Sequence, residues 1–213
     1  MNQVILIIPA FNEEENIQAV VEGLIKNYPE LDYVVVNDGS TDSTERILRA
    51  GGYNHITLPV NLGLAGSFQT GMKYAFERGY SCAVQFDGDG QHRAEYVAEM
   101  KEKMDEGYSI VIGSRFVNHK KDFSLRMVGS RMIGLAIWLT TGARITDPTS
   151  GMRMFDREMM EKFAYRMNYG PEPDTISLLI RQGAKVAEVP VVIDERKGGE
   201  SYLKPGVAVK YML

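Results

Sequence analysis

Short apolar runs alternate with amphipathic segments along the first half of the chain, and this alternation constrains the fold more than any other feature. Residues 4–8 form a continuous apolar run rich in β-branched side chains, which is typical of a strand buried on both faces. A segment with apolar residues at helical spacing follows, and a second buried run spans residues 33–36. Strand, helix and strand in this order predict parallel pairing with a right-handed crossover. We therefore expect an α/β fold with a mostly parallel sheet flanked by helices.

The composition is that of one ordinary folded domain. The chain has 213 residues, of which 44% are hydrophobic and 24% are charged, so we expect a single domain over residues 1–213. A net charge of −4 gives no electrostatic footprint for nucleic acid. The one cysteine, Cys82, excludes a disulfide framework and a cysteine-based zinc site, and fits a reducing compartment. There is no signal-peptide pattern and no apolar run near the ~20 residues that a transmembrane helix needs. The expected location is cytoplasmic, with any membrane contact peripheral.

Polar turns follow each of the first three predicted strands. Asn12 follows the first strand and is a plausible N-cap for the next helix, and Ser40 or Thr41 can cap the helix after the second strand. Asp38, at the end of the second strand, is either an acidic helix cap or a ligand for a ribose hydroxyl or a base N–H. After a third strand at 56–58, the turn containing Gly63 opens a helix, and its backbone N–H groups can approach an anion.

The fourth predicted strand, residues 80–86, ends in Asp87-Gly88-Asp89. Two carboxylates one residue apart suit a hard divalent cation that also holds phosphate oxygens, although an acidic turn in a hairpin is a common alternative. His92 is expected to pack rather than to ligate, because Mg²⁺ prefers carboxylates. Ligands of open α/β sheets bind outside the carboxyl ends of the strands, so four polar strand ends at one edge predict a binding site there.

The second half of the chain adds a cation and a distinctive helix. The predicted strand 109–112 ends in Arg115, a residue type suited to bidentate phosphate contacts. Residues 123–141 are mostly apolar with embedded arginines, so we expect a buried core helix, or alternatively an interfacial helix with Trp138 toward lipid. The last predicted strand, 186–193, contains Pro190, which indicates an edge strand.

Read together, these motifs resemble those of family 2 glycosyltransferases with the GT-A fold. Pro9-Ala10-Phe11-Asn12-Glu13 resembles the opening motif, residues 37–42 the second, residues 61–63 with Gly71 the third, and residues 87–92 the metal-binding D-x-D. More narrowly, residues 113–115, residues 147–151, and Arg196 with residues 199–201 resemble dolichyl- and polyprenyl-phosphate sugar synthases. The chain differs in having Gly88 where relatives often have Ala, and Gly90 where Leu is frequent.

The resemblance implies a metal-dependent inverting hexosyltransferase that moves a sugar from a UDP-, GDP- or dTDP-linked donor to a polyprenyl phosphate at the inner membrane surface. Residues 1–115 would bind the nucleotide sugar and residues 116–213 the acceptor. The implied catalytic residues are Asp89, Arg115, Asp147 and Arg196. The implied donor contacts are Pro9, Ala10, Asn12, Glu13, Asp38, Gly63, Asp87 and Gly88, with Mg²⁺ or Mn²⁺ held by Asp87, Asp89 and Gln91. The implied acceptor contacts are Arg131, Ser150, Arg196 and Ser201.

Two other functions remain open from the sequence. An acceptor phosphate is already ionised and needs positioning more than a strong base. A glycan or glycolipid hydroxyl, as in cell-wall polysaccharide synthesis, would instead require a base such as Asp147, Glu172 or Asp174. For Asp147, a turn cap before proline is an equally good interpretation. The third hypothesis is a nucleotide-sugar binding module without catalytic activity. The sequence does not specify the donor base, the sugar or the oligomeric state.

Overall fold

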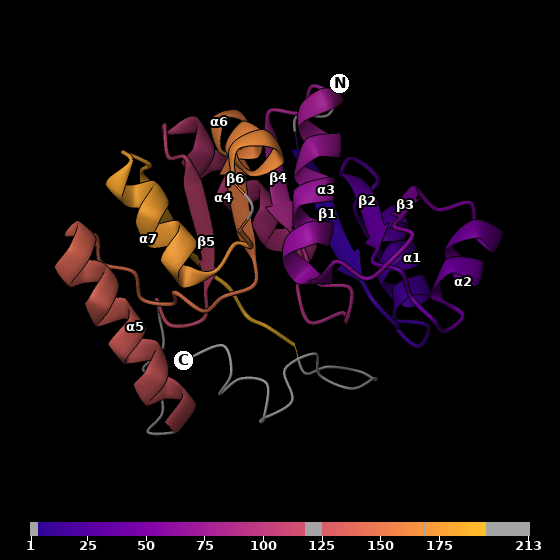
Figure 1. The fold of residues 1–213 in the computed structure, drawn as a ribbon, viewed down its shortest axis with the longest axis horizontal. Coiled ribbons are helices and arrows are strands. Elements are labelled where there is room, and N and C mark those ends of the chain that lie inside the picture. Colours follow the sequence, from indigo (N-terminus) through magenta and orange to yellow (C-terminus); the bar gives the residue numbers. More distant parts are fainter. Residues whose placement is uncertain (1–3, 118–124, 168, 195–213) are drawn as a thin grey trace.

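Seven strands form one sheet in the computed structural model, which describes residues 4–117, 125–167 and 169–194 (Figure 1). The strand order is β3-β2-β1-β4-β6-β5-β7, and every neighbouring pair is parallel except the two that β6 makes with β4 and β5. The prediction of a mostly parallel sheet is therefore confirmed. The strands are β1 (Val4–Ala10), β2 (Asp32–Asn37), β3 (His55–Thr57), β4 (Cys82–Gln85), β5 (Ile110–Ser114), β6 (Arg153–Asp156) and β7 (Val186–Pro190).

Helices cover both faces of the sheet and make three layers. Successive side chains of a strand point to opposite faces, so Leu6 and Ile8 of β1 join one hydrophobic core and Ile5 and Ile7 the other. The first core is closed by α1 (Ile17–Asn27), α2 (Thr44–Ala50) and α4 (Val97–Asp105), the last preceded by the 3₁₀ turn η1 (Ala94–Tyr96). The second is closed by α3 (Gly63–Glu77), α5 (Leu125–Thr141), α6 (Arg157–Glu161), the π-helical turn η2 (Lys162–Arg166) and α7 (Pro173–Arg181).

The helix α3 lies very close to β1 because Gly71 has no side chain at the contact. A Cβ atom on Gly71 would lie 2.2 Å from Cγ2 of Ile7, which is fully buried in the centre of the sheet. Phe68 and Met72 flank this point on α3 and are also fully buried. This close approach sets the separation of helix and sheet behind the nucleotide-binding turns predicted from the sequence.

Two predicted helix caps are wrong. The first helix begins at Ile17 with Asn16 at its N-cap, and Asn12 lies outside it with a left-handed φ of 56°. The second begins at Thr44 after Ser43, so neither Ser40 nor Thr41 caps it. The side chains of Asn12, Ser40 and Thr41 instead bond across the two turns, Asn12 to the second turn and Ser40 and Thr41 to Asn12.

The strand ends agree with the predicted edge and add one unpredicted strand. Because β3, β2, β1 and β4 are parallel neighbours, their carboxyl ends lie at one edge of the sheet, as predicted. The first strand extends through Pro9 to Ala10, past the apolar run 4–8, and β7 stops at Pro190 at the outer edge of the sheet, shorter than predicted. The sequence predicted no element at β6, which runs against its neighbours.

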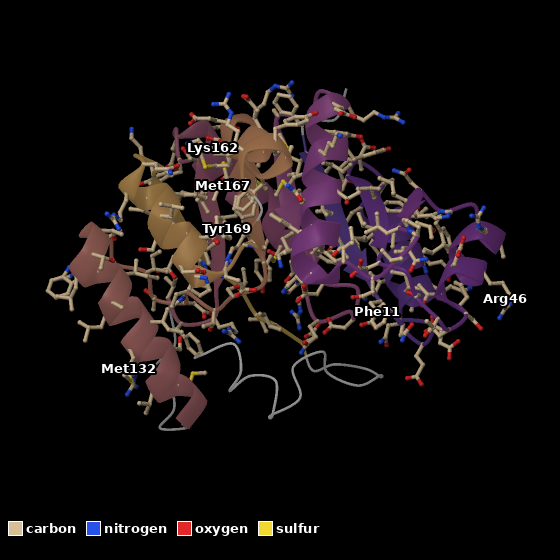
Figure 2. All side chains as sticks on the ribbon, viewed as in Figure 1. Phe11, Arg46, Met132, Lys162, Met167 and Tyr169 are labelled. Atoms are coloured by element: carbon tan, nitrogen blue, oxygen red, sulfur yellow. The ribbon has the colours of Figure 1, made fainter. Side chains whose placement is uncertain are left out.

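The helix α5 is not buried in the core, so that default prediction is wrong. It packs against α7 and buries Ile137, and Figure 1 shows it at the border of the molecule. Apolar side chains one helical turn apart face outward, and their exposed fractions are 44% for Val128, 67% for Met132, 53% for Leu135 and 70% for Leu139 (Met132 is labelled in Figure 2). Among the helices of the described segments, none has the length and apolarity needed to cross a membrane.

Candidate functional site

The turns after β1 and β2 are clasped together by side chain to backbone hydrogen bonds. The Asn12 N–H donates to Ser40 Oγ at 3.0 Å, and Asn12 Oδ1 accepts from the Thr41 N–H at 2.8 Å. The Glu13 N–H donates to Thr44 Oγ1 at 2.9 Å. The left-handed backbone of Asn12 turns its side chain toward this second loop. These two predicted donor contacts therefore also build the shape of the site.

Asp38 supports the turn that opens α3. Its Oδ1 accepts from the Leu62 N–H at 2.7 Å, and the Gly63 N–H is a second backbone donor to the same carboxylate. Burial raises the pKa of Asp38, although these two N–H groups lower it. The anion held by the predicted anion-binding turn is thus a carboxylate of the chain itself. Asp38 is 2% exposed and sits at the strand end where the sequence placed it.

The acidic turn after β4 is shaped by two glycines. Gly90 has a left-handed φ of 78°, and Asp89 Oδ1 accepts from the Gln91 N–H at 3.0 Å, so Asp89 and Gln91 share one tight turn. A Cβ atom on Gly88 would lie 3.2 Å from the carbonyl oxygen of Pro9. The acidic turn therefore lies against the end of β1, next to the clasped loops.

His92 orients Asp87. Its Nδ1 accepts from the Asp87 N–H at 2.9 Å, so in a neutral ring the proton is on Nε2, which lies 3.4 Å from Asp87 Oδ2. The ring is nearly inaccessible and makes an edge contact with Phe86. On the other side, a Cβ atom on Gly151 would lie only 3.0 Å from Asp87 Oδ2. The contacts of His92 agree with the packing role expected from the sequence, and they bring the 147–151 turn beside Asp87.

The donor atoms of this turn fit a hard divalent cation. Asp87, Asp89 and Gln91 offer carboxylate and amide oxygens, the ligand types that Mg²⁺ and Mn²⁺ take. Within the described segments, no group of three or more His, Cys, Asp or Glu side chains is arranged to hold a metal alone. Two carboxylates and one amide oxygen leave coordination positions of the cation open, and substrate phosphates commonly fill such positions.

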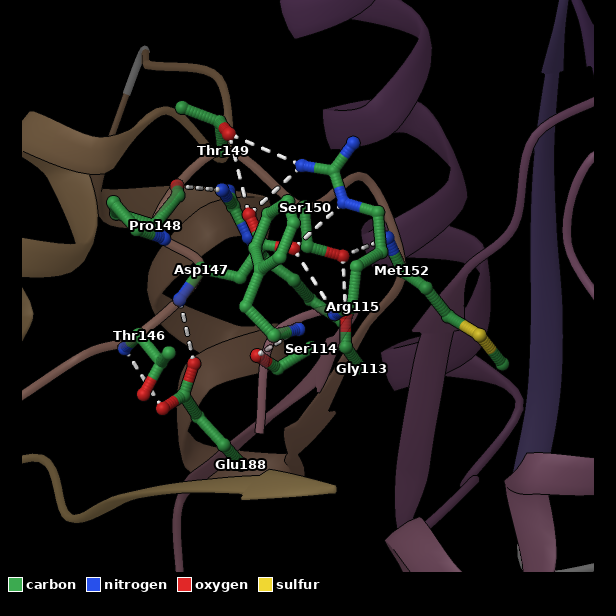
Figure 3. Close-up of polar contacts among 12 residues, drawn as sticks. Gly113, Ser114, Arg115, Thr146, Asp147, Pro148, Thr149, Ser150, Met152 and Glu188 are labelled. Atoms are coloured by element: carbon green, nitrogen blue, oxygen red, sulfur yellow. Dashed lines mark hydrogen bonds and ion pairs between the residues drawn. The ribbon is translucent and has the colours of Figure 1, made fainter. Parts of the chain in front are cut away.

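Arg115 and Asp147 form a buried ion pair across two turns (Figure 3). The Asp147 carboxylate accepts from Arg115 Nε at 2.7 Å, from Arg115 Nη2 at 2.8 Å and from the Arg115 backbone N–H at 3.1 Å. Thr149 Oγ1 adds a contact to each partner. This bidentate geometry fixes the guanidinium plane at the end of β5.

Glu188 fixes the Asp147 turn from β7. Its two carboxylate oxygens accept from the Thr146 and Asp147 N–H groups, each at 2.8 Å (Figure 3). Ser150 is buried, and its hydroxyl donates to the Gly113 carbonyl and accepts from the Met152 N–H. The position of Ser150 corrects the prediction that it contacts the acceptor, because its hydroxyl serves the backbone inside the fold.

Asp147 is a fixed counter-charge in this arrangement. Burial would raise its pKa, but the hydrogen bonds and charge of Arg115 outweigh burial and hold the pKa below its usual value. A carboxylate that accepts this many bonds and holds its proton weakly is a poor general base. Behind it, burial lowers the pKa of Arg153 to about 10, against the raising effect of Glu172, Asp147 and Asp87, so Arg153 stays cationic at neutral pH.

The remaining predicted residues are spread more widely. Arg131 lies on the exposed surface of α5, one turn before Leu135, and Glu172 and Asp174 are exposed at the start of α7. Arg196 and Ser201 lie outside the described residues. Glu188 and Arg153 were not predicted from the sequence. Glu188 is the one charge in the otherwise apolar β7, and that pattern was the available signal, whereas Arg153 shares the short β6 with Asp156 and had no such signal.

Comparison with known proteins gives a consistent result. Residues 5–163 match the family model described as "Glycosyl transferase family 2". A polyprenol monophosphomannose synthase of Mycolicibacterium smegmatis is 30% identical over 210 residues, covering 92% of this chain and 79% of its own. A UDP-N-acetylglucosamine–dolichyl-phosphate N-acetylglucosaminyltransferase of Methanococcus voltae is 29% identical, covering 87% of this chain and 83% of its own.

Solved structures show the same fold. The crystal structure of glucosyl-3-phosphoglycerate synthase from Mycobacterium tuberculosis, in complex with Mn²⁺, UDP and phosphoglyceric acid, aligns with a TM-score of 0.67 at 21% identity. The alignment covers 93% of this chain and 72% of that one.

Proposed function

Because the chain belongs to glycosyl transferase family 2 and is a hexosyltransferase with the GT-A fold, we propose that it transfers a hexose from a nucleotide sugar to a polyprenyl phosphate. The relatives named above act on lipid phosphates by name, which supports this acceptor class. In the proposed reaction, an acceptor phosphate oxygen forms a bond to the anomeric carbon of the donor sugar, from the face opposite the leaving nucleoside diphosphate. The bond from that carbon to the diphosphate breaks, with inversion.

The observation that carries the proposal is the state of Asp147. A hydroxyl acceptor must lose a proton during attack, and of the three candidate bases, Asp147, Glu172 and Asp174, only Asp147 is buried. Its carboxylate is instead held by three donors of Arg115, and its pKa is lowered. A site that presents a fixed guanidinium in place of a base suits an acceptor that is already ionised.

The donor is proposed to lie at the carboxyl ends of β1, β2 and β4. Pro9, Ala10, Asn12, Glu13, Asp38 and Gly63 would shape the nucleoside pocket, with Asp87 and Gly88 next to the ribose and phosphates. Asp87, Asp89 and Gln91 would hold Mg²⁺ or Mn²⁺, which when bound offsets the charge growing on the departing diphosphate. Arg115 supplies a second positive charge at the same edge. We assign the donor to residues 1–115 and the acceptor to residues 116–213.

On the acceptor side, the chain offers cations and apolar surface together. A hollow of about 290 Å³ beside α5 is lined by Leu135, Trp138, Ile145 and Arg144, whose guanidinium lies 5.8 Å from the Trp138 ring. An apolar lining with one arginine suits a lipid with an anionic head. Arg131, with Arg196 and Ser201 beyond the described residues, completes the proposed acceptor contacts.

The exposed face of α5 is proposed to rest on the cytoplasmic membrane surface, where the lipid acceptor resides. Apolar side chains in the interface and arginines toward the headgroups are the arrangement of an interfacial helix. We expect Leu135→Ser and Leu139→Ser each to weaken sedimentation with phosphatidylglycerol-containing vesicles about tenfold, because each leucine would lose its burial in lipid. Ile25→Ser is the matched control, since Ile25 is 49% exposed on α1. Equal loss in all three variants would contradict the assignment.

Transfer of radiolabelled sugar into a lipid fraction tests the function itself. Asp89→Ala is expected to lower the transfer rate about a hundredfold or more, because it removes an oxygen ligand at the leaving diphosphate. The control is Asp105→Ala, an exposed acid on α4 that pairs with Lys101 one turn earlier in the same helix. Full activity in the presence of EDTA would refute the metal assignment.

The chemistry of the product separates the acceptor classes. A sugar on a lipid phosphate is released by mild acid, whereas an alkali-stable product that resists mild acid would identify a hydroxyl acceptor. Binding of a nucleotide sugar without turnover on any acceptor would instead identify a binding module. A thermal-shift screen against UDP-, GDP- and dTDP-sugars with Mn²⁺ would identify the donor base, because a ligand stabilises the state it binds.

A further inference from the structure

The carboxamide of Gln91 is held by the backbone of Asp194. Gln91 Nε2 donates to the backbone carbonyl of Asp194 at 3.0 Å. The backbone N–H of Asp194 donates in return to the backbone carbonyl of Gln91 at 2.9 Å. A carbonyl oxygen accepts only from the NH₂ end of an amide, so the two ends of this side chain are distinguished by the contact. The Gln91 Oε1 atom is therefore turned away from Asp194.

Asp194 is in turn fixed by Arg93. Arg93 Nε donates to Asp194 Oδ2 at 3.0 Å, and Arg93 Nη2 donates to Oδ1 of the same carboxylate. The hydrogen bonds and charge of Asp194 raise the pKa of Arg93. Two parallel bonds between a guanidinium and a carboxylate restrict rotation as well as distance. Asp194, in the segment that follows β7, is thus joined to both Gln91 and Arg93, although it lies more than a hundred residues from them in the sequence.

We propose that Arg93 and Asp194 are positioning residues that orient the Gln91 carboxamide toward a divalent cation. The inference rests on the proposed function, in which Asp87, Asp89 and Gln91 hold that cation. Ligands of protein-bound metals are commonly oriented by hydrogen bonds from residues behind them, and loss of such a partner costs about 10–100-fold in metal affinity. Here the partner of the Gln91 amide is a backbone carbonyl, and Arg93 keeps that carbonyl in place.

Titration of the whole protein with Mn²⁺ alone, followed by electron paramagnetic resonance, tests the proposal without an activity assay. We expect Arg93→Met and Asp194→Asn each to weaken Mn²⁺ binding about 10–100-fold. Electrostatics alone predict the opposite result for Arg93→Met, because that substitution removes a positive charge near the cation. Both side chains are more than a third exposed, so the variants should fold, and circular dichroism would verify it.

Three further variants make the test specific. Glu95→Gln removes the other carboxylate near Arg93, at 3.6 Å, and should leave the affinity unchanged. Arg93→Lys keeps the positive charge but loses the two parallel hydrogen bonds to the Asp194 carboxylate, so it should weaken Mn²⁺ binding as well. In a Gln91→Ala background, Arg93→Met should not weaken Mn²⁺ binding further, because Arg93 is proposed to act only through the orientation of Gln91.

The outcomes separate this inference from the proposed function. Wild-type affinity in Arg93→Met, or an equal loss with and without Gln91, would overturn the positioning role while Asp89→Ala still weakened Mn²⁺ binding. Failure of the wild-type protein to bind Mn²⁺ would overturn this inference and the assignment of the metal ligands, whereas sugar transfer to a lipid phosphate is tested separately by the radiolabel assay.

Discussion

Replacement of Asp147 by asparagine is expected to destabilise the folded protein by about 3 kcal/mol, the lower end of the cost of breaking a buried ion pair. The Asp147 side chain is completely buried, and it accepts both the forked guanidinium and the backbone N–H of Arg115. Asparagine keeps the volume but presents an NH₂ group to one of these donors. The lower end applies because Arg115 keeps partial contact with water through its 23% exposed side chain. Guanidinium-induced unfolding measures the difference.

A double-mutant cycle with Arg115→Met isolates the pair. If the two residues stabilise the fold mainly through each other, the double variant should be little less stable than Asp147→Asn alone. Additive losses would show that Asp147 and Arg115 stabilise the protein independently. Thr57→Ala on the opposite edge strand β3 is a suitable reference, since it contacts neither residue.

The same pair predicts a pH dependence. The pKa of Asp147 is lowered in the folded state, and an aspartate in an unfolded chain has a pKa of about 3.9. A depressed folded pKa contributes stability above the unfolded pKa, and this contribution is lost as the pH falls through the folded pKa. The stability difference between wild type and Asp147→Asn should therefore be constant near neutrality and shrink below about pH 4. A difference that stays constant into acid would contradict the pairing.

The Gly71→Ala substitution is expected to destabilise the protein by about 3 kcal/mol, the upper end of the usual range for overpacking. The added Cβ would lie 2.2 Å from Ile7 Cγ2, so either α3 or β1 must shift. Ile7 is fully buried, and its neighbours in the sheet leave it no room to retreat. Thermal or denaturant unfolding measures the loss.

Two companion variants identify the cause. Gly23→Ala on α1 meets no atom within 4 Å, so it should stabilise by about 0.5–1 kcal/mol through helix propensity. Ile7→Ala should partly rescue Gly71→Ala, because it removes the clashing atoms. If Gly71→Ala were as harmless as Gly23→Ala, the close approach of α3 to the sheet would be wrong.

Much of the fold followed from local patterns in the sequence. The apolar runs that predicted β1, β2 and β4 are continuous and local in the sequence, and parallel pairing then placed Asp38 and Asp87 at one edge. The predicted caps failed at Asn12 and Thr41 because these side chains bond to each other's turns, nearly thirty residues apart. A cap and a cross-turn clasp use the same residue types, and only the tertiary fold distinguishes them.

The candidate site was less predictable than the sheet for the same reason. Arg115, Asp147 and Glu188 lie on three separate segments, and each reads locally as a surface charge or a turn residue. Their pairing depends on β6 and β7 flanking β5, and no local pattern marked β6 as a strand. The exposure of α5 agrees with the alternative and not with the default prediction, because a mostly apolar helix has the same composition whether it is buried in the core or lies at a surface.

The reversed direction of β6 has a consequence for how this chain can diverge. Residues between the end of β5 and the start of β6 leave the sheet and return to it at neighbouring points, where the Gly113 N–H bonds to the Met152 carbonyl at 2.9 Å. A connection whose two ends are adjacent can change in length at little entropic cost, since each doubling of its length costs about 0.6 kcal/mol. Under the proposed division of the chain into a donor part and an acceptor part, the stretch that contains α5 could be rebuilt for a new acceptor while the strands of the donor part keep their register.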